Sequence, residues 1–334
     1  MTHFRHSIVI PVFNEEQGLR ELHSRLGSAL SQPLAACDEE WEVLFVDDGS
    51  RDQSATILRE LRSDDPDHVR WIRFSRNFGH QAAITAGIDH ATGDTVTIMD
   101  ADLQDPPEVI LEMIARWRSG VDVVYGVRIG RRGETLFKKT TAAIFYRLLH
   151  WSTELDMPEG AGDFRLMSRR AVLALRGLRE RHRYLRGMSR WIGFEQAAVS
   201  YVRDARHAGA TKYPLRRMVR LSWDAITSFS VLPLELATGV GAFSIALGLL
   251  AALGALGAPA LSHAASRGWL VVLAVVLFVG GVQLLCLGVL GQYVGRILEE
   301  SKRRPLYIIE SMAGIAAPVS SERSTNSTSA EEKI

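Results

Sequence analysis

Short β-rich runs alternate with helical runs in the first part of this chain, and this alternation limits the fold more than any other feature. It extends over residues 7–127 and is typical of a mostly parallel sheet with helices on both faces. The expected strands are residues 7–12, 41–46, 69–74, 95–99 and 121–127. The expected helices between them include residues 17–31, 53–62 and 81–91. We therefore predict an α/β domain of the Rossmann type.

A further helix is expected soon after the strand that ends at residue 99. Asp105 can cap this helix, Pro106 suits its first turn, and Glu108 completes a capping box. We therefore expect the side chain of Asp105 to accept a hydrogen bond from the first turn.

Two apolar runs without charged residues lie near the C-terminal end, at 236–256 and 269–290. Each has about the 20 residues that a helix needs to cross a bilayer, and the short connection 257–268 predicts a hairpin. Basic residues lie on both outer sides of the pair, whereas only Arg267 lies between the runs. The positive-inside rule then predicts a multi-pass protein of the plasma membrane or cell inner membrane, with both termini and the large domain in the cytoplasm. Two buried helices of a soluble core are the alternative.

The remaining boundaries follow from composition. Residues 215–229 would form a basic amphipathic helix in the membrane interface, although an ordinary surface helix would have the same pattern. We divide the chain into a cytoplasmic α/β domain (1–210), a juxtamembrane segment (211–235), two membrane helices (236–292), a basic cytoplasmic segment (293–317) and a tail expected to be disordered (318–334). Cys37 and Cys286 predict neither a disulfide framework nor a metal cluster, and a net charge of +1 gives no sign of nucleic-acid binding.

Polar residues gather where three expected strands end. The first strand runs into Asn14-Glu15-Glu16, the second ends in Asp47-Asp48, and the fourth ends in Asp100-Ala101-Asp102. Ligands of open α/β sheets bind at the carboxyl ends of strands, and alternate residues of an extended chain point the same way. Asp100 and Asp102 can therefore face one ligand, and beside a nucleotide diphosphate they would need a divalent cation such as Mg²⁺. Taken alone, the pair fits a solvated turn or a helix cap equally well.

With these strand ends in order, the chain resembles glycosyltransferase family 2. The motifs that carry the resemblance are Ile8-Val9-Ile10-Pro11-Val12-Phe13-Asn14-Glu15-Glu16, Val46-Asp47-Asp48-Gly49-Ser50, Arg76-Asn77-Phe78-Gly79-His80 and Met99-Asp100-Ala101-Asp102-Leu103-Gln104-Asp105. Two later stretches, followed by the apolar runs, look like the polyprenyl-phosphate branch of that family: Gly162-Asp163-Phe164-Arg165-Leu166-Met167 and Ala208-Gly209-Ala210-Thr211-Lys212-Tyr213. That branch includes dolichol-phosphate mannose synthase and the bactoprenol glucosyltransferases, and the second group is the more similar. The resemblance covers residues 7–310.

The resemblance implies a GT-A-like fold and a transfer that inverts the anomeric centre of the sugar. The residues that would hold the base and ribose of the donor are Pro11, Phe13, Glu15 and Asp47. Asp100 would lie near the ribose and diphosphate, and Asp102, with Gln104, would bind Mg²⁺ or Mn²⁺.

A lipid phosphate acceptor needs cations near the site, and arginine pairs with phosphate in a defined geometry. The candidates for this role are Arg128, Arg131, Arg165, Arg206 and Lys212. The stretch around Gly209, which contains the last two and Arg203, is expected to be a mobile loop that closes over donor and acceptor. Contact of these cations with anionic lipid headgroups is the alternative.

Asp102 and Asp163 are the candidate catalytic residues. Asp163 could act as a general base, but a phosphate monoester has its second pKa near ~6 and is already largely anionic at neutral pH. Asp163 could instead orient an arginine or the acceptor. His80 could reach the site as well, although a lone histidine is more often structural.

We predict the transfer of a single hexose, with UDP-glucose as the expected donor, to undecaprenyl phosphate or a similar polyprenyl phosphate, for use in a surface glycan. Processive synthases of the family carry Gln-x-x-Arg-Trp, whereas here Gly187 stands where that glutamine would precede Arg190-Trp191. Alternatives are another sugar, a non-phosphate lipid acceptor such as diacylglycerol, an inactive binding relative, and a channel or flippase with a regulatory soluble domain. Gln283 is the only strongly polar side chain in the apolar runs, which disfavours a channel, and glycines at seven-residue spacing suggest an oligomer.

Overall fold

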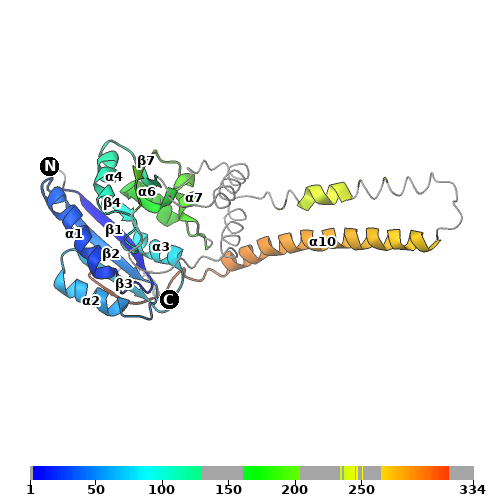
Figure 1. Cartoon of the computed structure of the whole chain (residues 1–334), viewed down its shortest axis with the longest axis horizontal. Helices are drawn as coiled ribbons and strands as arrows, with labels where there is room; N and C mark the ends of the chain where they lie inside the picture. The colour runs from blue at the N-terminus through cyan, green and yellow to red at the C-terminus, as the bar shows by residue number, and fades with distance from the viewer. Residues whose placement is uncertain are drawn as a thin grey trace, which may run out of the picture.

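The computed structural model describes residues 3–129, 161–181, 183–203, 237–244 and 265–315, with the single positions 234, 246 and 250. These residues form an eight-stranded sheet with helices on both faces, from which one long helix projects (Figure 1). The strand order is β7-β5-β6-β4-β1-β2-β3-β8. The predicted α/β fold is therefore confirmed.

Four central strands are parallel, as the alternation predicted. They are β1 (Arg5–Val12), β2 (Glu40–Asp47), β3 (Val69–Phe74) and β4 (Thr95–Ile98). Val12 pairs with Asp47, so β1 and β2 end level with one another. The acidic strand ends therefore meet at one edge of the sheet.

The outer strands are less regular than the sequence pattern indicated. The expected fifth strand is β5 (Val123–Arg128), but β6 (Ala161–Ser168) lies between it and β4 and is antiparallel to both. β7 (Gln196–Tyr201) pairs with β5 in parallel, and β8 (Ile309–Ala313) pairs with β3 in antiparallel orientation. β8 belongs to the segment 293–317, for which only a basic stretch was expected, so the chain returns to the sheet after its long helix.

The helices cover the two faces in sets of three. One face carries α1 (Leu19–Ala35), α2 (Ser54–Asp64) and α4 (Val109–Arg118). The other carries α3 (His80–His90), α6 (Arg169–Gly177) and α7 (Leu185–Trp191). Side chains of β1 alternate between these layers: Ile8 and Ile10 pack in the first core, and Val9 packs in the second. Burial of each such side chain contributes about 1.5–3 kcal/mol.

A glycine brings α3 close to the sheet. A Cβ at Gly87 would lie 2.1 Å from Cγ1 of Val9, so no larger residue fits between α3 and β1 without a shift. Because α3 connects β3 to β4, its first residue, His80, lies at the carboxyl edge where the acidic residues end their strands.

The expected cap of α4 is wrong. The helix begins at Val109 after Glu108, and its N-terminus has no side-chain cap. Asp105 is fully buried and accepts a hydrogen bond from the hydroxyl of Tyr201 instead. A residue of β7 thus donates the hydrogen bond to Oδ1 of this carboxylate that the helix was expected to supply.

The long helix is α10 (Ala265–Ser301), which contains the second apolar run. Within the described residues, one helical stretch, Phe278–Ser301, is long and apolar enough to cross a bilayer. None of the residues in its most apolar part is buried against the rest of the protein. Residues 237–244 are helical and lie beside α10 (Figure 1), where the thiol of Cys286 donates a hydrogen bond to the carbonyl of Ala237 at 3.4 Å. The rest of the first run, residues 215–229 and residues 318–334 lie outside the described residues, so the two-helix hairpin stays a prediction.

Candidate active site

The loops after β1 and β2 hold one another through reciprocal hydrogen bonds. The backbone N–H of Asn14 donates to Oγ of Ser50 at 3.0 Å, and that of Arg51 donates to Oδ1 of Asn14 at 2.9 Å. Further along, the backbone N–H of Gln53 donates to a carboxylate oxygen of Glu16 at 2.9 Å. Asn14 has a φ of 57°, a left-handed conformation that asparagine tolerates well. The two strand ends therefore form one fixed rim.

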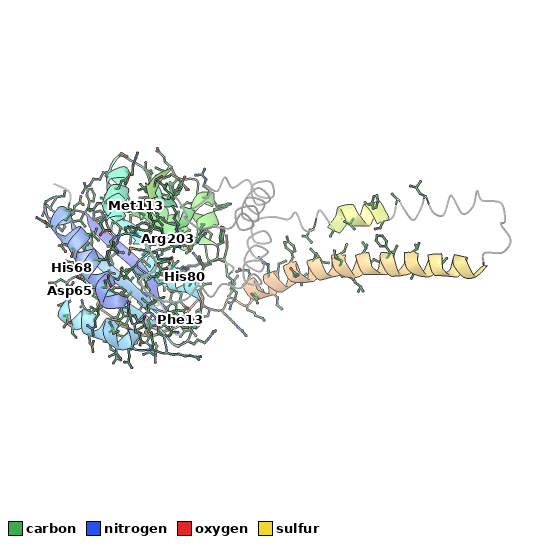
Figure 2. The ribbon with its side chains drawn as sticks, viewed as in Figure 1. Phe13, Asp65, His68, His80, Met113 and Arg203 are labelled. Carbon is green, nitrogen blue, oxygen red and sulfur yellow. The ribbon has the colours of Figure 1, made fainter. Side chains whose placement is uncertain are left out.

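The residues expected at the donor base and ribose differ in their exposure. Phe13 is 43% exposed, Glu15 is half-buried and Pro11 is buried. Figure 2 shows Phe13 in the half of the domain nearer α10, together with His80 and Arg203. Phe13 and Glu15 are thus the members of this set that present a surface to a ligand.

Asp47 and Asp48 are buried at the end of β2. Oδ1 of Asp47 accepts a hydrogen bond from the backbone of Ser50 at 2.8 Å, and its Oδ2 lies 3.6 Å from Nε of Arg73. The carboxylate of Asp48 accepts hydrogen bonds from the backbone N–H groups of residues 78 and 79 at 2.6 and 2.9 Å. Asp48 therefore fixes the loop that leads into α3.

The two aspartates after β4 lie on a turn with an unusual backbone. Leu103 has a φ of 58°, a left-handed conformation that bulky residues rarely adopt. Its side chain is buried, and this packing holds the backbone in that conformation. The backbone N–H of Gln104 donates to Oδ1 of Asp102 at 3.2 Å, and Oδ2 of Asp102 lies 3.7 Å from a guanidinium nitrogen of Arg203. Asp100 and Asp102 are 28% and 12% exposed.

This donor set fits a hard divalent cation. Within the part of the chain that the structure describes, no group of three or more His, Cys, Asp or Glu side chains forms a metal cage. Mg²⁺ in nucleotide sites needs no such cage, because one or two carboxylates together with phosphate oxygens and water complete its coordination. The Asp102 carboxylate and the nearby Gln104 amide are oxygen donors of that kind.

His80 lies between two acidic residues from different strands. Its Nε2 is 3.6 Å from Oδ1 of Asp100 and 3.6 Å from Oδ2 of Asp163. Burial alone would lower the pKa of His80, but the two carboxylates outweigh it and raise that pKa above its ordinary value. Burial, opposed by His80 and aided by the neighbouring aspartates, raises the pKa of Asp100 to about 6. The histidine therefore reaches the acidic cluster rather than the core.

Asp163 reaches this cluster because β6 is antiparallel to β4. Ile98 pairs with Arg165, which places Asp163 level with Asp100 at the same edge of the sheet. Its two carboxylate oxygens accept hydrogen bonds from Nε and Nη2 of Arg186 at 2.8 and 3.2 Å. Burial alone would raise the pKa of Asp163, but His80 and Arg186 outweigh it and hold that pKa well below its usual range.

Arg186 was not among the predicted site residues. It is the second residue of α7, directly before Gly187. No spacing or pattern in the sequence distinguishes it from the other arginines nearby. Only the tertiary arrangement of α7 against β6 brings it to Asp163.

The predicted acceptor cations have different surroundings. Arg128 donates from Nε to the hydroxyl of Tyr201 at 3.1 Å, and its Nη2 lies 3.7 Å from the buried carboxylate of Asp105. Nε of Arg203 lies 3.8 Å from the same carboxylate. Arg128 is 16% exposed, so it sits at the margin of the site with a fixed orientation. Arg131, Arg206 and Lys212 lie outside the described residues.

The structure does not bring Arg165 to the site surface. Its side chain is buried, and its guanidinium donates to the carbonyl of Gly162 at 2.9 Å, to the carbonyl of Leu185 at 3.4 Å and to the hydroxyl of Ser189. Burial lowers the pKa of Arg165 to about 10. This arginine therefore links β6 to α7 and has no donors directed at a ligand.

An α/β domain with acidic and basic side chains converging at the carboxyl ends of its strands has the arrangement of an enzyme active site. Residues 7–175 match the family described as glycosyl transferase family 2. The chain belongs to this family and is a glycosyltransferase.

Relatives extend along almost the whole chain. An uncharacterized glycosyltransferase of Bacillus subtilis (strain 168), YkcC, is 49% identical and covers 94% of this chain and 95% of its own. The bactoprenol glucosyl transferase of Shigella phage SfV is 40% identical and covers 91% of this chain and 97% of its own. A solved mannosyltransferase from Pyrobaculum calidifontis, in complex with GDP-Man and Mn2+, covers 85% of this chain and 86% of its own, with 17% identity and a TM-score of 0.44. A likeness of that degree carries nothing about substrate or metal.

Proposed function

We propose that this protein transfers a single hexose from a nucleotide sugar to a polyprenyl phosphate at the cytoplasmic face of a membrane. The donor expected first is UDP-glucose, and the acceptor is undecaprenyl phosphate or a similar lipid. Relatives named bactoprenol glucosyl transferase, 38–40% identical over nearly the full chain, support the lipid acceptor. An acceptor phosphate oxygen would form a bond to the anomeric carbon as the bond from that carbon to the diphosphate breaks, with inversion.

The observation that carries this proposal is the meeting of Asp100, Asp163 and His80 at one edge of the sheet. Asp102 and Gln104, two and four residues beyond Asp100, would hold Mg²⁺ or Mn²⁺. A bound cation supplies Lewis-acid stabilisation to the departing diphosphate. Phe13 and Glu15 would contact the base and ribose, with the buried Pro11 and Asp47 shaping the rim behind them.

For the acceptor phosphate, we propose Arg128 together with Arg131, Arg206 and Lys212. Arg128 has the support of its position near Asp105 and Tyr201 at the carboxyl end of β5. For Asp163 we propose a positioning role through Arg186 rather than a general-base role, because a carboxylate with a very low pKa is a weak base. The acceptor phosphate needs no base, since it is largely anionic at neutral pH.

The membrane placement has its support in α10. Large apolar side chains along this helix are exposed, including Phe278, Leu284, Leu287 and Leu290. A continuous apolar surface of this length needs a cover, and a bilayer provides one. In this placement the catalytic domain and both termini lie on the cytoplasmic side.

The test uses the full chain in detergent with undecaprenyl phosphate, Mg²⁺ or Mn²⁺, and a panel of radiolabelled UDP- and GDP-sugars. Label extracted into organic solvent from one donor, and absent with Asp102→Asn, is the expected result. Donor hydrolysis without label in the lipid would contradict the phosphate acceptor and favour a non-phosphate lipid such as diacylglycerol. Label from a donor other than UDP-glucose would replace the sugar and keep the reaction class.

A further inference from the structure

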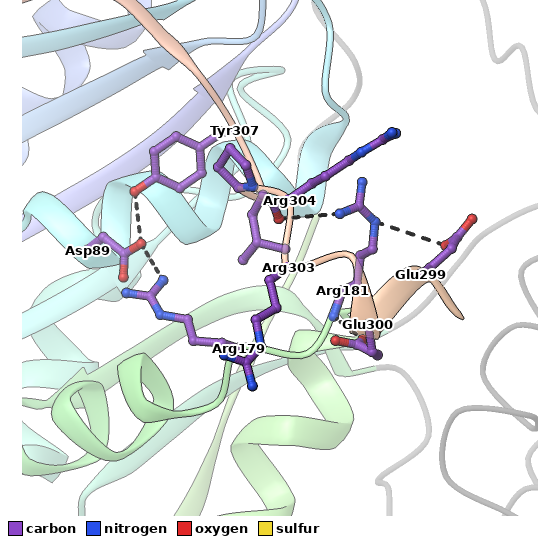
Figure 3. Close-up of a pocket in the computed structure, with 10 residues that line it drawn as sticks. Asp89, Arg179, Arg181, Glu299, Glu300, Arg303, Arg304 and Tyr307 are labelled. Carbon is purple, nitrogen blue, oxygen red and sulfur yellow. Dashed lines mark hydrogen bonds and ion pairs between the residues drawn. The ribbon is translucent and has the colours of Figure 1, made fainter. Parts of the chain in front are cut away.

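A mixed-charge pocket lies where α10 returns to the sheet. It has a volume of about 640 Å³ and is lined by the end of α10, the connection to β8, the segment after α6 and the last turn of α3 (Figure 3). We propose that this junction pocket binds a membrane phospholipid headgroup that carries both a phosphate and a primary amine, the phosphoethanolamine class. The proposal rests on the membrane placement of α10 but not on the identity of the sugar or acceptor.

The walls of the junction pocket are held by internal pairs. Arg179 donates to Oδ2 of Asp89 at 2.7 Å, and the hydroxyl of Tyr307 donates to the same oxygen at 2.8 Å. The ring of Tyr307 stacks on Phe74 with centroids 5.1 Å apart. These contacts fasten the connection to β8 against α3 before any ligand binds, so little ordering remains to oppose binding.

Arg181 fastens the other wall. Its backbone N–H donates to a carboxylate oxygen of Glu300 at 2.6 Å, and its Nη1 donates to the carbonyl of Arg304 at 3.3 Å. This second bond fixes the backbone that carries Arg303 and Arg304, and Arg303 has a φ of 47°, which turns the chain sharply at the end of α10. The two arginine side chains extend from either side of this turn (Figure 3).

Arg303 and Arg304 supply the phosphate-binding charge. Both side chains are exposed, and within the described residues neither has a carboxylate partner. Guanidinium groups bind phosphate oxygens through charge-assisted hydrogen bonds, which are stronger than neutral ones. The other two arginines of the pocket already face acidic residues, so these two are the ones available to an anion.

The acidic residues of the pocket decide the class of headgroup. Glu299 and Glu300 line the same pocket as the two exposed arginines, and both also contact Arg181. Because a carboxylate accepts several hydrogen bonds, a primary ammonium next to the phosphate could add donors to these two groups. A quaternary amine has no N–H to donate, so a choline headgroup fits the same wall less well.

The position of the pocket favours a lipid over a solute. The candidate membrane-spanning stretch of α10 is Phe278–Ser301, and its last residues, from Glu299 on, line the pocket, at the level where headgroups meet a spanning helix. The pocket is also separate from the acidic cluster. Asp89 and His80 lie nine residues apart on α3, on the order of 14 Å along the helix axis.

The test measures retention of phosphatidylethanolamine by the full chain in detergent, using native mass spectrometry. Loss of Arg303 and Arg304 together, as Arg303→Ala with Arg304→Ala, should weaken retention about 10-fold or more, since each removes a charge-assisted phosphate contact. Lys302→Ala is the matched control, because it removes a neighbouring charge that does not line the pocket. An equal loss in the Lys302→Ala variant would reduce the effect to general surface charge and overturn the proposal.

Further measurements test the headgroup class and distinguish a lipid from a soluble ligand. Equal retention of phosphatidylcholine or phosphatidylglycerol would overturn the amine assignment, and competition by soluble glycerophosphoethanolamine at equal concentration would overturn the lipid source. Co-sedimentation with phosphatidylcholine vesicles tests the membrane placement by itself. If the unaltered chain fails to co-sediment, the proposed placement of α10 fails. If it co-sediments but shows no headgroup preference in the retention measurement, only this inference fails.

Discussion

The carboxylate of Asp163 is bound edge-on by the guanidinium of Arg186, with hydrogen bonds of 2.8 and 3.2 Å. The pair joins the first residues of β6 to α7 at the margin of the acidic cluster. Because Arg186 donates to both oxygens of the carboxylate, Asp163 is better suited to hold the guanidinium of Arg186 in place than to accept a proton. The same carboxylate lies 3.6 Å from Nε2 of His80, which in turn lies 3.6 Å from Asp100.

The first prediction concerns the pH dependence of transfer. Removing Arg186, as Arg186→Ala, takes away a positive charge that holds the pKa of Asp163 low, so that pKa should rise. Because Asp163 acts through Arg186, the variant should be less active at every pH, and protonation of Asp163 as pH falls should add little to that loss. Initial rates across a pH series, at saturating donor, measure this.

A double-mutant cycle controls that prediction. If Arg186 and Asp163 act as one unit, Arg186→Ala combined with Asp163→Asn should be little worse than either single change. Additive losses would show that the two residues act independently. Arg186→Lys should rescue only partly, because an ammonium cannot make the two parallel hydrogen bonds.

A second prediction tests the cation site. Asp102→Asn keeps the shape of the turn but removes the charge, so cation affinity and turnover should fall by about 100-fold or more. Gln104→Ala should have a smaller effect, because an amide oxygen is a weaker ligand than a carboxylate. Titration of Mn²⁺ followed by electron paramagnetic resonance measures binding without turnover. Unchanged Mn²⁺ affinity in Asp102→Asn would remove the metal assignment.

A third prediction separates acceptor from donor binding. Arg128→Ala should raise the KM for the polyprenyl phosphate by about 10-fold while the Kd for the nucleotide sugar changes little. Tyr201→Phe is the comparison variant, since it removes the 3.1 Å contact that orients Arg128, together with the hydrogen bond to Asp105, but keeps the charge of Arg128. Equal weakening of donor and acceptor by Arg128→Ala would show that this arginine does not distinguish the two ligands.

The central sheet could be predicted because its strands are short, apolar and rich in β-branched residues. β6 and β8 could not, since Asp163 and Arg165 interrupt the first and the second has the mixed sequence Ile309–Ala313. Their formation depends on pairing with β4 and β3, which are distant in the sequence. The local sequence pattern therefore located the central strands of the sheet but not these outer strands.

The site shows the same division. Strand order alone places Asp100 and Asp102 at the correct edge, so the acidic cluster was predictable. Which arginine faces it was not: Arg165 lies on a strand that α7 covers, whereas Arg186 on α7 reaches Asp163. Asp105 has the sequence signature of a helix cap, yet Tyr201 from a strand distant in sequence binds it.

The last prediction tests how the sheet positions His80. Gly87→Ala would put a methyl group 2.1 Å from Cγ1 of Val9, which should destabilise the fold by about 1–3 kcal/mol through overpacking. A thermal midpoint lower by roughly 2–4 °C per kcal/mol is expected for a domain of this size. Because α3 must shift to relieve the contact, His80 at its first residue should move away from Asp100, and turnover should fall as well.

Gly27→Ala is the matched control for this change. Gly27 lies inside α1, and a Cβ there meets no atom within 4 Å, so alanine should stabilise the helix by about 0.5–1 kcal/mol. Opposite signs for the two glycine variants would confirm that the contact with Val9, and not helix propensity, sets the effect. If Gly87→Ala also raised the midpoint, α3 would be free to move relative to β1, and the sheet could not be what fixes His80 beside the acidic cluster.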